Sequence, residues 1–270
     1  MSSSDYLLAG QVTELERLQL QSRVWEPAGR ALLAQLEGGD GARALDVGCG
    51  GFGWLRILSA WVGPQGSVTG TDVDATSLDA ARALIRAEGL GNVTVARDDL
   101  FASRLEVGAF DLVHARFELA PLGRAEEQLA AYLRLAKPGG RLILEDPDIG
   151  SWHFNPPAPA AERLIGLIAE AFLGSGGNLD AGRRGAALLR AAGLEPEMRA
   201  EVYALPPGHP YLPMPLQFSV SLEPRLLRLI SRDELDELRR LAEGELAQPG
   251  RWGTTFTLIQ TWATVRPGPP

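Results

Sequence analysis

The sequence predicts an α/β protein built on a mostly parallel β-sheet, and three features support this fold class. A short apolar run at residues 43–47 leads into the glycine cluster Gly48-Cys49-Gly50-Gly51-Phe52-Gly53, and helical apolar spacing follows it. A second apolar run ends in Asp72, roughly 20 residues further on, where doubly wound folds place an acidic residue. Strand-like and helix-like segments then alternate as far as residue 146, as a parallel sheet requires.

The glycine cluster predicts a nucleotide pocket between the first strand and the first helix of the sheet. Glycine takes up positive φ at low cost and lets bare backbone N–H groups approach a ligand. The N-terminus of the following helix adds partial positive charge. Asp72 is the expected ribose-binding carboxylate. The alternative is that Asp72 only caps the next helix, although Asp74 is at least as well placed for that cap.

The remaining elements of the first half follow in chain order. Residues 5–37 predict one or two amphipathic helices with Leu15, Leu18 and Trp25 on one face, and Pro27 marks a break or a new first turn. Right-handed crossovers should bring the loops after the strands to one edge of the sheet. The strands are expected at 43–47, 67–72, 92–96, 110–115 and 140–146, and the helices near 53–62, 76–88 and 124–136.

The second half predicts further helices and the last strands. The Pro-rich residues 206–215 predict neither a helix nor a central strand. Helices are expected at 160–173, 181–192, 223–230 and 232–247, and an antiparallel pair of strands at 199–205 and 254–265. The predicted organisation is an N-terminal helical cap (1–37), a core (38–205), a lid insertion (206–253), and a last core strand with a tail (254–270).

Composition and charge narrow the class of protein. With 270 residues, 45% of them hydrophobic, the chain is long enough for one α/β domain with a cap. The net charge of −8 disfavours a nucleic-acid partner. Because apolar runs stay short of the ~20 residues that span a bilayer, we expect a cytoplasmic protein without a membrane partner. The single Cys49 allows no intrachain disulfide, and the widely separated His114, His153 and His209 indicate no metal site.

Four segments resemble class I S-adenosylmethionine (SAM) dependent methyltransferases. Asp46-Val47-Gly48-Cys49-Gly50 is similar to their first motif, and Asp72 matches the acid that ends their second strand. Asp98-Asp99-Leu100 with residues 109–114, and then residues 135–144, match their later motifs in order. The N-terminal segment resembles the cap of bacterial small-molecule enzymes of secondary metabolism. Phe52 stands where the family usually has a third glycine, with Gly53 beside it.

The resemblance implies a Rossmann-like sheet of seven strands, mostly parallel with an antiparallel last strand, and SAM as a cofactor without a metal. Gly48 and Gly50 would face the amino-acid part of SAM, and Asp72 would accept both ribose hydroxyls. Asp99, with Asp98 as its competitor, would bind the adenine amino group. Residues 5–37, including Tyr6, would fold over the cofactor; alternatively Tyr6 and Arg17 only anchor a surface helix. The implied cofactor residues are Asp46, Gly48, Cys49, Gly50, Asp72, Val73, Asp98, Asp99, Leu100 (which would pack on the adenine ring) and His114.

The loop after the fifth strand is the predicted substrate-binding segment. Trp152, His153 and Phe154 follow that strand at the expected cofactor edge, where loops carry function, and Tyr6 of the cap is expected to face the same substrate. The alternative is a connector whose aromatic rings fill the core. His153 is the first candidate for a catalytic base, and His114 is the second unless it is only hydrogen-bonded in the interior.

The predicted function is methyl transfer from SAM to a small, apolar or aromatic acceptor at oxygen or nitrogen, with S-adenosylhomocysteine (SAH) as the product. Methyl transfer is an in-line displacement, so alignment of the acceptor dominates and a base is needed only when the acceptor must lose a proton. The alternative is a protein of the same fold that binds SAM without transferring methyl groups, either as a binding module or as a rearrangement catalyst.

Overall fold

The computed structural model describes residues 12–51 and 53–266, and within these ranges seven strands form the main sheet. The strand β10 runs antiparallel to both of its neighbours, β5 and β7, whereas the pairs from β3 to β5 are parallel. The predicted fold class is therefore confirmed. In sheet order the strands are β3 (Val93–Arg97), β2 (Ser67–Asp72), β1 (Arg43–Val47), β4 (Phe110–Arg116), β5 (Ala136–Asp148), β10 (Thr257–Thr264) and β7 (Glu197–Glu201).

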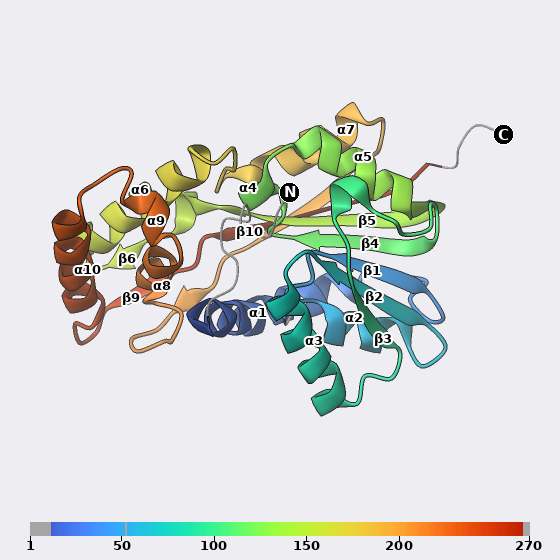
Figure 1. Cartoon of the computed structure of the whole chain (residues 1–270), viewed down its shortest axis with the longest axis horizontal. Coiled ribbons are helices and arrows are strands. Elements are labelled where there is room, and N and C mark those ends of the chain that lie inside the picture. The colour runs from blue at the N-terminus through green and yellow to red at the C-terminus, as the bar shows by residue number, and fades with distance from the viewer. Residues whose placement is uncertain (1–11, 52, 267–270) are drawn as a thin grey trace.

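Helices cover both faces of the main sheet, and the central strands β1 and β4 are mostly buried between them (Figure 1). One face carries α2 (Leu55–Val62) and α3 (Ala75–Glu88), and the other carries α5 (Ala125–Leu135) and α7 (Gly185–Ala191). The turn at Ala181–Arg184 continues into α7, so the helix expected at 181–192 is present with a 3₁₀ first turn.

The N-terminal helix α1 (Val12–Leu33) passes through Pro27 without interruption, so the expected break there is wrong. Proline removes one backbone donor and crowds the preceding turn, which favours a break. Here Pro27 is exposed, and buried side chains on both sides of it, Trp25 and Ala28 among them, hold the helix against the protein. Tertiary packing overrides the local preference.

A second group of elements lies beside the carboxyl edge of the main sheet, at the left of Figure 1. α10 packs on α6, and α8 contacts both α6 and α1. Within the described ranges, β6, β9 and β8 form a separate small sheet. These elements are α6 (Pro159–Leu173), α8 (Met214–Ser221), α9 (Glu223–Leu226), α10 (Arg232–Leu246), β6 (Phe154–Asn155), β8 (Ala204–Leu205) and β9 (Trp252–Thr254).

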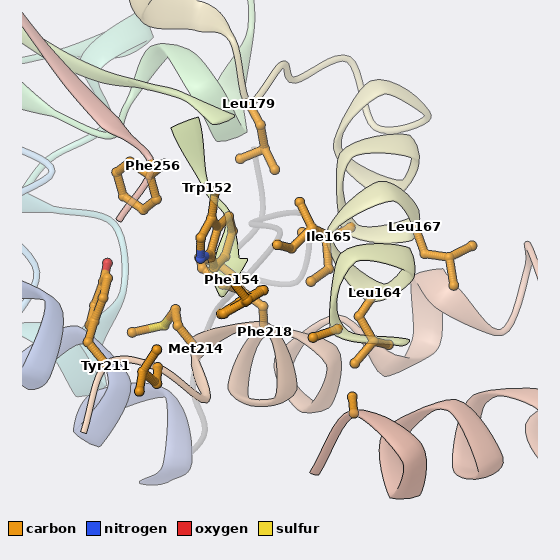
Figure 2. Close-up of a cluster of buried hydrophobic side chains, with 14 of the residues drawn as sticks. Trp152, Phe154, Leu164, Ile165, Leu167, Leu179, Tyr211, Met214, Phe218 and Phe256 are labelled. Atoms are coloured by element: carbon orange, nitrogen blue, oxygen red, sulfur yellow. The ribbon is translucent and has the colours of Figure 1, made fainter. Parts of the chain in front are cut away.

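This group has its own apolar core, part of which is drawn in Figure 2. Trp152 and Phe154 meet Phe218 of α8 and Ile165 of α6 in that core. Trp25 joins them from α1, and its Nε1 donates to the hydroxyl of Tyr211 at 3.4 Å. The small sheet and α8 were not expected from the sequence, and α8 begins at Met214, inside the Pro-rich residues 206–215 that predicted no helix. The predicted domain boundaries stay a prediction.

Candidate cofactor and acceptor site

The loops at the carboxyl ends of β1 to β4 surround two adjacent cavities in the described part of the chain. Three residues line both cavities: Gly48, Asp72 and Glu118. The smaller cavity continues along the end of β3, and the larger one continues under α1 and α8. This is the edge of the sheet at which the sequence places its motifs, and where doubly wound sheets bind ligands.

The glycine turn needs glycine at two positions for different reasons. Gly48 has a φ of +61°, and a Cβ added there would lie 1.9 Å from Oε1 of Glu118. Gly53 lies so close to the preceding turn that an added Cβ would approach the carbonyl oxygen of Cys49 to 2.4 Å. Gly53 therefore allows the close approach in this turn, while Phe52 lies outside the described residues.

Asp72 ties the end of β2 to the glycine turn. One of its carboxylate oxygens accepts the Gly50 N–H at 3.0 Å, and the other accepts the Asp74 N–H at 2.8 Å. Burial raises the pKa of Asp72, although these backbone N–H groups partly offset the effect. Asp74 is the residue that caps α3, through the Ser77 N–H at 2.8 Å. A carboxylate oxygen has a further lone pair, so Asp72 can still accept a ligand hydroxyl.

The smaller cavity contains the other residues expected around adenine. Val73, Asp98, Asp99 and Leu100 all line it, and Leu100 supplies a buried apolar surface. Asp99 accepts the Phe101 N–H at 3.0 Å and starts a 3₁₀ turn at Leu100–Ala102, whereas Asp98 accepts the Arg104 N–H at 3.0 Å. Both acids therefore shape the loop as well as border the cavity.

His114 is buried within a chain of polar side chains that crosses the main sheet. Its Nδ1 lies 2.7 Å from Oδ1 of Asp46, and its Nε2 lies 3.1 Å from Oε2 of Glu145. Glu145 also accepts from Gln260 on β10, and the ring of His114 stacks on Trp54 at a centroid distance of 3.8 Å. Burial lowers the pKa of His114, but the two carboxylates raise it by more than burial lowers it. The pKa of His114 is therefore raised overall.

This geometry favours a structural role for His114 over a catalytic one. Both ring nitrogens contact carboxylates and the side chain is buried, although it borders the larger cavity, and its expected role as a base stays a prediction. The second carboxylate oxygen of Asp46 accepts a hydrogen bond from the Trp54 N–H at 3.0 Å, at the start of α2. Asp46 and His114 border the larger cavity and link the strands β1 and β4.

The predicted substrate loop is divided between two environments. Trp152 is buried and lines the larger cavity, and Phe154 is buried in the apolar core of Figure 2. His153 between them is exposed and, within the described chain, is not among the residues that line either cavity. Successive side chains of an extended segment point to opposite sides. The structure thus places His153 outside both cavities, and its expected role as a base stays a prediction; Tyr6 lies outside the described residues.

The larger cavity has aromatic walls that come from distant parts of the chain. Phe117 follows β4, Phe218 belongs to α8, and Phe256 precedes β10. Trp152 meets Phe218 and Phe256 edge-on, at centroid distances of 6.3 and 5.8 Å. The sequence did not single out Phe117, Phe218 and Phe256 as site residues, because they lie far apart in the chain and only the fold brings them to one cavity.

Two arginines add positive charge to the larger cavity. Arg17 of α1 is buried, donates to Gln21 at 2.6 Å and lies 4.3 Å from the ring centre of Phe218. Arg116 at the end of β4 also lines the cavity. The next residue, Phe117, has a φ of +60°, a strained value for a residue other than glycine that is typical of functional sites.

Within the described residues, no group of His, Cys, Asp and Glu side chains could hold a metal ion. A search of the same residues for helices able to cross a bilayer finds none.

Comparisons with known proteins agree with this geometry. A family model described as a methyltransferase domain matches residues 44–140. The nocamycin O-methyltransferase of Saccharothrix syringae is 32% identical over 136 residues, which are 49% of this chain and 49% of that protein. The aklanonic acid methyltransferase of Streptomyces sp. (strain C5) is 32% identical over 133 residues, which are 48% of this chain and 60% of that protein. The match thus spans about half of these relatives.

A solved structure extends the likeness beyond the matched region. The SAM-dependent methyltransferase from Aquifex aeolicus superimposes with a TM-score of 0.54 at 22% identity, covering 71% of this chain and 92% of that one. At this identity the likeness concerns the fold. Residues 44–140 therefore match a methyltransferase domain, and the fold around them is similar to that of a SAM-dependent methyltransferase.

Proposed function

We propose that this protein transfers the methyl group of SAM to a small, apolar or aromatic acceptor. The observation that carries the proposal is the pair of cavities that meet at Gly48, Asp72 and Glu118. One cavity has the acids and the apolar surface that an adenosine needs, and the other has the aromatic walls that a flat organic molecule needs.

The cofactor would lie along the ends of β1, β2 and β3. Leu100 would pack on the adenine ring, with Asp99 or Asp98 near its amino group, and Asp72 would accept the ribose hydroxyls. The turn at Gly48 and Gly50 would receive the amino-acid part. SAM supplies a methyl group made electrophilic by its sulfonium; the residues of the chain bind and orient the two partners.

The acceptor would lie between the aromatic walls of the larger cavity, with the described part of α1 and with α8 covering it. Burial under these helices excludes water, and a fixed orientation of the acceptor atom toward the methyl group lowers the barrier by proximity. Both ring nitrogens of His114 contact carboxylates, and the side chain of His153 is exposed, which supports a mechanism without a histidine base. We therefore assign catalysis to alignment. The name of the nocamycin relative favours an oxygen acceptor, and nitrogen is the alternative.

Two measurements on the purified protein test the proposal. Calorimetry should show binding of SAM and of SAH, and incubation with SAM and a panel of phenolic, enolic and amine acceptors should yield SAH together with a methylated product. Binding without SAH formation from any acceptor would favour the non-transferring alternative. Failure to bind either molecule would contradict the cofactor assignment itself.

A further inference from the structure

Glu118 brings a carboxylate to the boundary between the two cavities. It follows β4 and precedes the short helix α4 (Leu119–Leu122), its exposed fraction is 7%, and it lines both cavities. The side chain lies directly over the glycine turn, so close that an atom added to Gly48 would collide with Oε1 of Glu118. The carboxylate is therefore aimed at the path that joins the adenosine side to the acceptor side.

The charged side chains that interact with Glu118 in the described part of the chain are acids. Among the described residues, the Glu118 carboxylate has neither a hydrogen-bond donor nor a cationic partner, although it is more than nine-tenths buried. Burial and the nearby acids raise its pKa well above the usual range of a glutamate. The titratable groups that interact with Glu118 are Asp46 on β1, Cys49 in the glycine turn, Asp72 on β2, Tyr132 on α5 and Asp146 on β5. A buried carboxylate surrounded by other acids is stabilised in its charged form only when a cation lies beside it.

We infer that Glu118 faces the sulfonium of SAM and makes the site discriminate SAM from SAH, an inference that rests on the proposed function. In SAM the sulfonium lies between the adenosine and the amino-acid part, and it must also face the acceptor. The boundary between the two cavities, where Glu118 lies, is the place that meets both conditions.

The two cofactor forms differ by one methyl group and its positive charge. When the methyl group moves, the acceptor's lone pair forms the new bond to carbon, the carbon–sulfur bond breaks, and its electron pair stays on sulfur as a neutral thioether. A carboxylate at this point thus attracts SAM and loses its attraction for the product. Glu118 favours exchange of SAH for SAM after each turnover, and it gives no help to the transfer step, in which the sulfonium charge disappears.

Proton linkage supplies a second signature of this contact. Without a cation the neutral acid form of Glu118 is favoured, because its pKa is raised. A sulfonium beside it favours the carboxylate and lowers that pKa, so SAM binding should release protons whereas SAH binding should not. The preference for SAM should therefore rise with pH between the pKa of the SAM complex and that of the free protein, and level off above the latter.

Calorimetry with both ligands on the whole chain tests the inference. Relative to the wild type, Glu118→Gln should weaken SAM binding about tenfold or more, which corresponds to roughly one unit of pKa coupling. The same variant should leave SAH affinity within about threefold, because SAH has no sulfonium to lose. Glu126→Gln, which removes an exposed carboxylate from α5, is the matched control and should change neither affinity. Titrations in buffers of different ionisation enthalpy should show proton release with SAM in the wild type and its loss in Glu118→Gln.

The experiment distinguishes a failure of the role of Glu118 from a failure of the proposed function. Equal weakening of SAM and SAH by Glu118→Gln, or no effect on either, would overturn the role of Glu118 and leave the proposed function standing. Absence of binding of both ligands to the wild type would overturn the proposed function and this inference with it. If Glu118→Gln does not fold, the wild type decides alone: a SAM-to-SAH preference that stays constant from the ordinary pKa of a glutamate upward, across the pH range in which the protein stays folded, would overturn the inference.

Discussion

Asp46 and His114 occupy paired positions on the neighbouring strands β1 and β4, and their side chains meet at 2.7 Å from Oδ1 to Nδ1. Glu145 on β5 contacts the other ring nitrogen, Nε2, of His114. Gln260, which pairs with Glu145 in the register of β10 and β5, donates a hydrogen bond to the Glu145 carboxylate. One buried imidazole thereby links four adjacent strands through side chains. The network sits directly beneath the glycine turn, so its integrity supports the cofactor side.

Replacing His114 should destabilise the fold strongly. His114→Gln leaves two buried carboxylates without their shared partner, so we expect the free energy of unfolding to fall by about 3–5 kcal/mol. Urea denaturation measures it, and His153→Gln, at an exposed position, is the control that should change little. A loss of less than about 1 kcal/mol in His114→Gln would show that the network contributes no net stability.

The same network predicts how stability depends on pH. The pKa of His114 is raised in the folded protein, so its stabilising contribution is fully present below the unfolded value of about 6.5 and is lost as pH rises through the folded pKa. The free energy of unfolding of the wild type minus that of His114→Gln should therefore shrink from pH 6 upward. A difference that is flat or grows with pH would contradict the assignment of a raised pKa.

Asp72→Ala should separate cofactor binding from helix capping. It removes the acceptor for two ribose hydroxyls, at most about 1.5–3 kcal/mol each, and we expect SAM affinity to fall at least about tenfold. Asp74→Ala is the matched control: it removes the cap of α3, which should cost about 1 kcal/mol of stability and leave SAM affinity nearly unchanged. Unchanged SAM affinity in Asp72→Ala would refute the ribose assignment.

His153→Ala should leave catalysis intact. The side chain is exposed, while its backbone N–H is held by Thr254 Oγ1 at 3.3 Å and is untouched by the change. We expect kcat to stay within about twofold of the wild type, because loss of a true catalytic base would lower it by roughly 10²- to 10⁴-fold. Trp152→Ala, at the neighbouring buried position, should instead raise KM for the acceptor. A large fall in kcat for His153→Ala would restore this residue as a base.

Hydrogen exchange should locate the cover of the site. α1 and residues 206–247 pack on each other through Trp25 and Tyr211 and through Arg17 and Phe218. If these segments open to admit ligands, cofactor and acceptor together should protect their backbone amides more than those of β1 and β4. Protection that is equal with and without ligands would indicate a rigid cover.

The sequence predicts the elements around the smaller cavity well and the walls of the larger cavity poorly, for a physical reason. The strands, the glycine turn and Asp72 follow local rules of periodicity and turn chemistry, so their pattern is visible within a few residues. Whether His153 or Trp152 points inward depends instead on the pairing of β6 with β9, about a hundred residues further along the chain. The environment of Glu118 likewise arises from acids on three separate strands, and no spacing in the sequence reveals it.

The two sides of the site have separate origins in the chain. The smaller cavity is built mainly from residues 47–101, with Glu118 and Leu122, whereas the larger one adds residues of α1 and the rings of Phe117, Trp152, Phe172, Phe218 and Phe256. Except for Phe117, these rings lie beyond residues 44–140, where the family model ends. Under the proposed function, selection for a different acceptor can therefore act on residues outside the matched region, and chains that share one cofactor site can diversify toward unrelated molecules.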